Sequence, residues 1–91
     1  MKYRSRTEIV SMILKSASSG ATTTKIMYKA YLSYSQMKEY LANMEKNELI
    51  RFEEGTRLYR VTEKGLKLMH LYEEISDMVT TKNENPVKLS I

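Results

Sequence analysis

Hydrophobic residues recur at helical spacing through the first part of the chain. Within residues 5–18, Ile9 is followed by apolar residues three and four positions later, which indicates one face of an amphipathic helix. Ser5 and Glu8, three positions apart, form a capping box, so the start of this helix is defined locally. The small polar residues and the glycine that follow, up to Gly20, end the helix.

A second and a third helix are predicted on either side of a very short turn. The second covers about Lys25–Tyr31, after threonines that can cap it. Ser33 and Gln36 form another capping box and open a third helix from Tyr34 to about Asn47. The inward stripe of the third helix consists of Met37, Tyr40, Leu41 and Met44.

The pattern then changes from helical spacing to alternation of apolar and polar residues. Residues 49–53 and 58–62 alternate in this way, and a turn with Gly55 separates them, so they predict an antiparallel hairpin with a charged tip. A last helix is predicted from Glu63 to about Thr81, with Gly65 as a weak point near its start.

This order of elements defines the fold class that the sequence predicts. It is mainly α with a small β-hairpin (α+β), a winged helix-turn-helix followed by a C-terminal helix. We expect a winged domain over residues 1–62 with a basic N-terminal arm over residues 1–6, a dimerisation helix over 63–82 and a polar tail over 83–91.

The last helix carries an apolar stripe that suits an antiparallel, coiled-coil-like homodimer. Its members recur at spacings of three and four, with two flanking residues. The predicted dimer interface is Leu68, Leu71, Tyr72, Ile75, Met78 and Val79. The alternative is that this stripe covers the core of the same chain.

Composition narrows the possible functions. The chain has 91 residues, no cysteine and one histidine, so we expect one small domain with no disulfide, no metal site and no cofactor. No phosphate-binding loop is present, and Glu73, Glu74 and Asp77 form an acidic helix face without a base partner, so a non-enzyme is predicted. No apolar run approaches the length of a membrane span, which predicts a soluble, cytoplasmic protein.

The distribution of charge points to a polyanion as partner. Residues 1–62 hold 11 lysines and arginines against 6 acidic residues, a net charge of +5, whereas residues 63–91 hold 4 against 5, a net charge of −1. A basic front of this kind is typical of proteins that bind double-stranded DNA, which would associate this protein with the nucleoid.

Candidate DNA contacts lie on three parts of the predicted fold. The recognition helix, residues 34–47, would enter the major groove, the wing at residues 54–57 would lie along the backbone, and the basic arm would reach phosphates or the minor groove. The candidates are Arg4, Arg6, Lys25, Lys29, Ser35, Gln36, Lys38 and Arg57. A solvated, non-binding surface is the alternative for each of them.

Three runs of residues carry a closer resemblance. Thr24–Tyr34 (TKIMYKAYLSY), Leu49-Ile50 and Val61–Gly65 (VTEKG) resemble the archaeal winged-helix DNA-binding proteins of the small 10-kDa chromatin-protein type, and the broader group of archaeal winged-helix transcription regulators. The resemblance implies dimeric, largely sequence-tolerant binding of double-stranded DNA, with dimerisation through an antiparallel coiled coil of the last helix. The polar stretch Asn83–Pro86 departs from this pattern, because it shortens that helix.

One interpretation competes with DNA binding, and another would add a second mode of contact with DNA. The acidic residues on the presumed DNA side, Glu39, Glu48, Glu53 and Glu54, favour a winged-helix protein-interaction module without direct DNA contact. Base stacking by tyrosines is the less favoured addition, because Tyr28, Tyr34, Tyr40 and Tyr59 occupy positions that we expect in the core.

Overall fold

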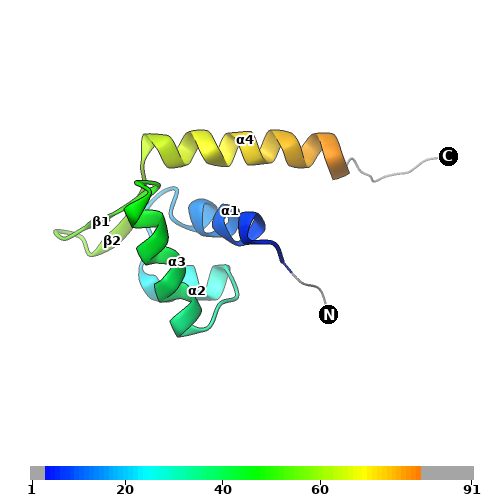
Figure 1. The fold of residues 1–91 in the computed structure, drawn as a ribbon. Helices are drawn as coiled ribbons and strands as arrows, with labels where there is room; N and C mark the ends of the chain where they lie inside the picture. The colour runs from blue at the N-terminus through cyan, green and yellow to red at the C-terminus, as the bar shows by residue number, and fades with distance from the viewer. Residues whose placement is uncertain (1–3, 81–91) are drawn as a thin grey trace.

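The computed structural model describes residues 4–80 and contains four helices and one two-stranded sheet (Figure 1). In chain order these are α1 (Arg6–Ser16), α2 (Thr23–Lys29), α3 (Tyr34–Lys46), β1 (Ile50–Glu53), β2 (Leu58–Val61) and α4 (Glu63–Thr80). The predicted fold class is confirmed. Lys2 of the predicted arm, and the predicted tail over residues 83–91, lie outside the described residues.

Side-chain caps define the starts of the first three helices. Ser5 and Glu8 form the predicted capping box of α1, and Ser33 and Gln36 form that of α3. Thr22 caps α2, so this helix begins and ends two residues earlier than predicted.

The turn between α2 and α3 follows a Schellman motif. The Leu32 amide donates to the Met27 carbonyl over 3.0 Å, and the Tyr31 amide donates to the Tyr28 carbonyl over 3.3 Å. Tyr31 adopts a φ of +54° to close this motif. Glycine usually fills such a left-handed position, and another residue there costs on the order of 1 kcal/mol.

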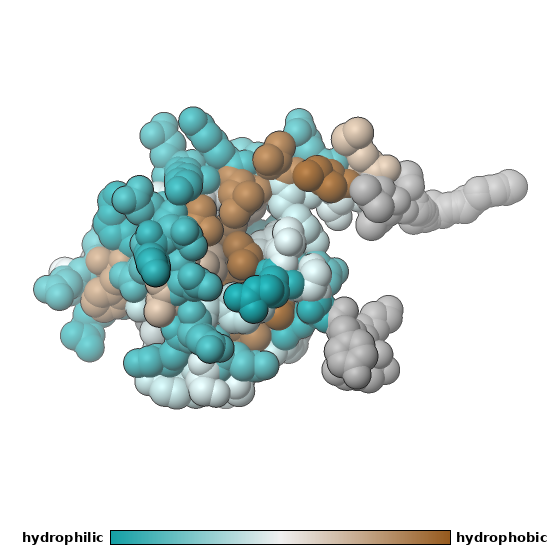
Figure 2. Space-filling model, viewed as in Figure 1, coloured by the Kyte–Doolittle hydropathy of each residue, from teal (hydrophilic) through white to brown (hydrophobic). Residues whose placement is uncertain are grey.

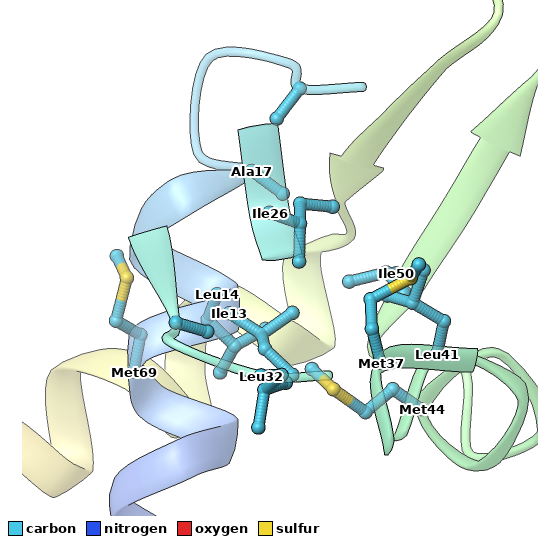
Figure 3. Close-up of a cluster of buried hydrophobic side chains, with 12 residues drawn as sticks. Ile13, Leu14, Ala17, Ile26, Leu32, Met37, Leu41, Met44, Ile50 and Met69 are labelled. Carbon is cyan, nitrogen blue, oxygen red and sulfur yellow. The ribbon is translucent and has the colours of Figure 1, made fainter. Parts of the chain in front are cut away.

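The core lies between α1, α2, α3 and the start of the hairpin. Figure 3 shows its side chains converging from these elements, with Met69 of α4 at one side of the cluster. The buried hydrophobic residues are Ile13, Leu14, Ala17, Ala21, Ile26, Ala30, Leu32, Met37, Leu41, Met44, Ile50 and Met69. α1 contacts both α2 and α4, so it lies between α4 and the helix-turn-helix.

The hairpin is attached to the helical body through the loop before α2. β1 and β2 pair antiparallel with Ile50 opposite Val61, and Ala21 forms an isolated bridge with Tyr59. Two backbone hydrogen bonds of 3.0 and 2.8 Å close this bridge. The rings of Phe52 and Tyr59 lie 5.0 Å apart and pack across the pair.

Gly65 is a point of close packing, which corrects its interpretation as a weak point of the last helix. A Cβ atom at this position would lie 2.2 Å from the Leu49 carbonyl oxygen and 2.8 Å from the Val61 Cγ1 atom. The absence of a side chain is therefore what lets the start of α4 pack against the residue that precedes β1.

The expectation that four tyrosines lie in the core is half wrong. Tyr28 and Tyr34 are 73% and 62% exposed, whereas Tyr40 and Tyr59 are half-buried and pack against the core. Ile26 is the buried side chain of α2, and a residue two positions further along a helix points to the opposite side, so Tyr28 faces solvent.

Candidate nucleic-acid interface

The start of α3 presents a shallow surface hollow that unites three of the predicted contact residues. Ser35, Gln36 and Lys38 line it together with Tyr34 and Glu39, and all five side chains are exposed. The buried stripe of α3 consists of Met37, Leu41 and Met44, as predicted apart from the half-buried Tyr40. Helical periodicity therefore turns this polar surface away from the core.

Part of the Gln36 side chain is already committed within the protein. Its Oε1 atom accepts a hydrogen bond of 3.0 Å from the Ser33 amide, which completes the capping box. Bidentate recognition of adenine needs both the oxygen and the amide nitrogen of a glutamine. In this conformation the Gln36 amide nitrogen is free to donate to a base or a phosphate, whereas one of the two lone pairs of its oxygen is already used within the protein.

Lys38 lies beside an aromatic ring at the edge of the hollow. Its Nζ atom is 5.7 Å from the centroid of the Tyr34 ring, within cation–π range. Among residues 4–80, no cation lies within ion-pair distance of Glu39, so Lys38 keeps its charge available to a partner.

The two arginines of the predicted arm make contacts within the protein. The Arg4 guanidinium donates to the Ala30 and Tyr31 carbonyl oxygens, the latter over 2.8 Å, and so binds carbonyls at the C-terminal end of α2. Arg6 is the first residue of α1, and its guanidinium carbon lies 5.4 Å from the centroid of the Tyr40 ring. The structure thus gives Arg4 a role in holding the helix-turn-helix together.

Replacing Arg4 with glutamine should lower the free energy of unfolding by about 2 kcal/mol, because two charge-assisted hydrogen bonds to α2 carbonyls are lost. Urea denaturation followed by circular dichroism measures this change. The control is Arg57→Gln, since the Arg57 side chain is exposed, and it should stay within about 0.5 kcal/mol of the original protein. Equal stability of the two variants would contradict this role for Arg4.

The hairpin carries three arginines: Arg60 is paired with an acidic neighbour, whereas Arg51 and Arg57 are exposed. Glu53 accepts hydrogen bonds from Thr56 Oγ1 over 2.6 Å and from Arg60 Nε over 3.0 Å. These bonds, first from Thr56 and then from Arg60, hold the pKa of Glu53 below its ordinary value. Arg57 is exposed at the tip with a φ of +60°, so it remains the wing residue best able to reach a phosphate.

The other two predicted phosphate contacts lie on α2. Lys25 and Lys29 are both exposed, and Lys29 flanks a shallow depression shared with Met12, Lys15 and Ser16 of α1. They are four residues apart on one short helix, so they point to the same side of it.

The predicted dimer residues divide into two groups on α4. Leu68 and Tyr72 line an apolar groove of about 220 Å³ against α1, whereas Leu71, Ile75 and Met78 are 54%, 53% and 82% exposed. Figure 2 shows apolar side chains gathered along α4 and on the surface below it. The Val79 side chain lies outside the described part of the chain.

Comparison with known proteins agrees with this architecture. The sequence model of the winged helix-turn-helix family matches residues 3–80, most of the chain. The chain belongs to the winged helix-turn-helix family. No curated protein matches it significantly.

Among solved structures, this winged helix-turn-helix protein is similar to Sso10a-2, described as a DNA-binding protein from Sulfolobus solfataricus. The TM-score is 0.67 and the sequence identity 26%, over 87% of this chain and all of the other. The resemblance to archaeal winged-helix DNA-binding proteins is thereby confirmed.

Two further properties bear on the range of partners. Within the part of the chain that the structure describes, no helix combines the length and hydropathy needed to cross a membrane. No group of three or more acidic, histidine or cysteine side chains within residues 4–80 is arranged to hold a metal ion.

Sequence reasoning missed one conspicuous residue of the winged helix-turn-helix surface. Tyr31 is 76% exposed and lies at the corner between α2 and α3, with the Arg4 guanidinium carbon 6.0 Å from its ring centroid. The signal in the sequence was a capping box directly after a short helix, which requires a tight turn and hence a left-handed residue near position 31.

Proposed function

We propose that this protein binds double-stranded DNA as a homodimer and acts in the cytoplasm on the nucleoid, by binding and without catalysis. The observation that carries the proposal is the exposed, lysine-bearing hollow at the start of α3. In a winged helix-turn-helix this segment enters the major groove, and the similar structure of Sso10a-2 belongs to a DNA-binding protein.

The phosphate contacts follow from the exposed cations around this hollow. Lys25 and Lys29 lie on α2, Lys38 on α3 and Arg57 at the wing tip, and all four side chains are exposed. Each cation that neutralises a phosphate releases a counterion, so most of the binding energy would be independent of sequence. Arg4 drops out of this set because it is bonded to α2 carbonyls.

Weak sequence preference follows from the side chains that α3 offers. Its face opposite the buried stripe carries short or charged residues, and the Gln36 oxygen is held in the capping box. Base discrimination depends on bidentate hydrogen bonds, for which this face has little capacity. We therefore favour a chromatin-organising role over that of a site-specific repressor.

The exposed apolar face of α4 supports the homodimer. Leu71, Ile75 and Met78 recur at spacings of four and three, and each is more than half exposed within one chain. Packing against the same face of a second α4 would remove these side chains from water.

Equilibrium binding to a random duplex and to the DNA upstream of its own gene should give similar affinities, both falling steeply as salt rises. Each substitution removes one cation from both protomers of the proposed homodimer. We therefore expect Lys25→Gln and Lys38→Gln each to reduce the slope of log affinity against log salt by about two. Fluorescence anisotropy over a salt series measures both quantities.

Lys67→Gln is the control for these lysine variants, because Lys67 is an exposed lysine of α4, away from the proposed surface. It should leave the slope unchanged. Absence of binding at low salt would contradict the proposal and leave a protein-interaction module. A preference of about 4 kcal/mol or more for the upstream DNA would instead indicate a specific regulator.

A further inference from the structure

Three exposed tyrosines surround the corner between α2 and α3. Tyr28 lies in the last turn of α2, Tyr31 in the turn itself, and Tyr34 at the first position of α3. Their exposed fractions are 73%, 76% and 62%, values that leave each phenol in solvent within a span of seven residues. Large aromatic side chains exposed together on a small domain usually mark a contact surface.

The charge around this tyrosine corner is mainly positive, although Glu39 lines the hollow of α3 together with Tyr34. Residues 9–38 contain four lysines and no acidic residue, and α2, the turn and the start of α3 all fall within this stretch. Of these lysines, Lys15 lies 3.8 Å from Glu73 of α4, while Lys38 stands beside the Tyr34 ring. Complementarity of charge therefore favours a polyanion over a protein as the partner.

The backbone of the corner is fixed although it is strained. Tyr31 has a left-handed φ of +54°, and the Arg4 guanidinium donates to the carbonyl oxygens of Ala30 and Tyr31. A tyrosine held at a position that suits glycine, with its ring in solvent, is the kind of local strain that functional surfaces retain.

We propose that the hydroxyls of Tyr28, Tyr31 and Tyr34 donate hydrogen bonds to phosphate oxygens of double-stranded DNA beside α3. This inference rests on the proposed function and deepens it, since it adds three uncharged phosphate contacts to those of the exposed cations. The phenols contact phosphates because the bases of a duplex are stacked and present no free face. On the hairpin, Arg60 is paired with Glu53, so the proposed phosphate contact there is the exposed Arg57.

The test is the triple variant Y28F/Y31F/Y34F, which removes three hydroxyls and keeps the charge, the rings and the strained backbone. We expect random-duplex affinity to fall at least about tenfold, because hydrogen bonds to a charged group are lost. The salt slope should stay unchanged, since no cation is removed. The matched control is Y40F/Y59F, at the two half-buried tyrosines, which should bind as the original protein does.

The outcomes separate this inference from the proposed function. Original affinity in the triple variant would overturn the inference and leave DNA binding intact, whereas no binding by the unmodified protein would overturn both. Affinity kept by the phenylalanine variant but lost on replacement by alanine would indicate ring contacts, and would overturn the hydroxyl contacts proposed here.

Chemical modification gives a second readout that does not depend on affinity. Nitration by tetranitromethane, followed by peptide mass spectrometry, should be slowed by duplex DNA at Tyr28, Tyr31 and Tyr34. The half-buried Tyr40 and Tyr59 serve as internal references and should react at the same rate with and without DNA. Unchanged nitration of the three corner tyrosines in the complex would overturn the inference.

Discussion

Gly65→Ala should lower the free energy of unfolding by about 3 kcal/mol, a large part of the stability of a domain of this size. The added Cβ would lie 2.2 Å from the Leu49 carbonyl oxygen, 2.8 Å from Val61 Cγ1 and 3.2 Å from Leu14 Cδ2. A backbone atom cannot move aside as a flexible side chain can, so α4 would have to shift away from α1 and the hairpin. Because Met69 of α4 belongs to the buried core, such a shift would also loosen the core.

Gly55, in the turn of the hairpin, offers a matched control. A Cβ at Gly55 meets no atom within 4 Å, and Gly55 is not among the residues with positive φ. Gly55→Ala should therefore change the unfolding free energy by less than about 0.5 kcal/mol. Thermal unfolding should separate the two variants by about 10 °C or more, and coincident transitions would contradict the packing role of Gly65.

Local signals in the sequence were sufficient to predict the order of elements. Each capping box joins two residues three positions apart, so Ser5 and Ser33 define the starts of their helices without help from tertiary structure. Alternation over residues 49–53 and 58–62 predicted the hairpin in the same way, because successive side chains of a strand point to opposite faces. The strands observed are Ile50–Glu53 and Leu58–Val61.

Contacts between distant residues could not be predicted from such signals. Arg4 binds carbonyls 26 and 27 residues away, and nothing local distinguishes it from a free basic arm. Gly65 was misjudged for the same reason, since the atom it accommodates belongs to Leu49. A glycine early in a helix indicates weakness by propensity alone, and only the packed structure reveals the close approach.

The tyrosines show where hydropathy itself is ambiguous. A tyrosine side chain is compatible both with the core and with an exposed contact surface. Which of the two it occupies depends on the side of the helix on which its position falls. α2 ends at Lys29, so Tyr28 belongs to its last turn and points away from the buried Ile26. The sequence pattern predicted this helix to extend to residue 31. Tyr31 was therefore assigned a helical conformation instead of its left-handed one, and the exposed corner was not predicted.

Ile75→Asp should convert the proposed homodimer into a monomer. Ile75 is 53% exposed on the α4 face where Leu71 and Met78 are also exposed, so a charge at its centre would be buried without a partner in the dimer. Two linked DNA-binding domains gain effective concentration from one another, so the monomer should bind a duplex spanning both sites about 10²-fold or more weaker. Sedimentation equilibrium measures the mass, and anisotropy measures the affinity.

His70→Asp tests whether this effect belongs to the apolar face or to any new charge on α4. His70 is exposed on the same helix but away from the row of Leu71, Ile75 and Met78, and the substitution introduces the same side chain. It should leave both mass and DNA affinity unchanged. If the Ile75→Asp variant keeps the mass of a dimer, the dimer interface must lie elsewhere than on this face of α4. An unpaired carboxylate buried at the centre of the interface would destabilise the dimer strongly. A monomeric original protein that still binds DNA tightly would mean that a single α3 and its tyrosine corner suffice.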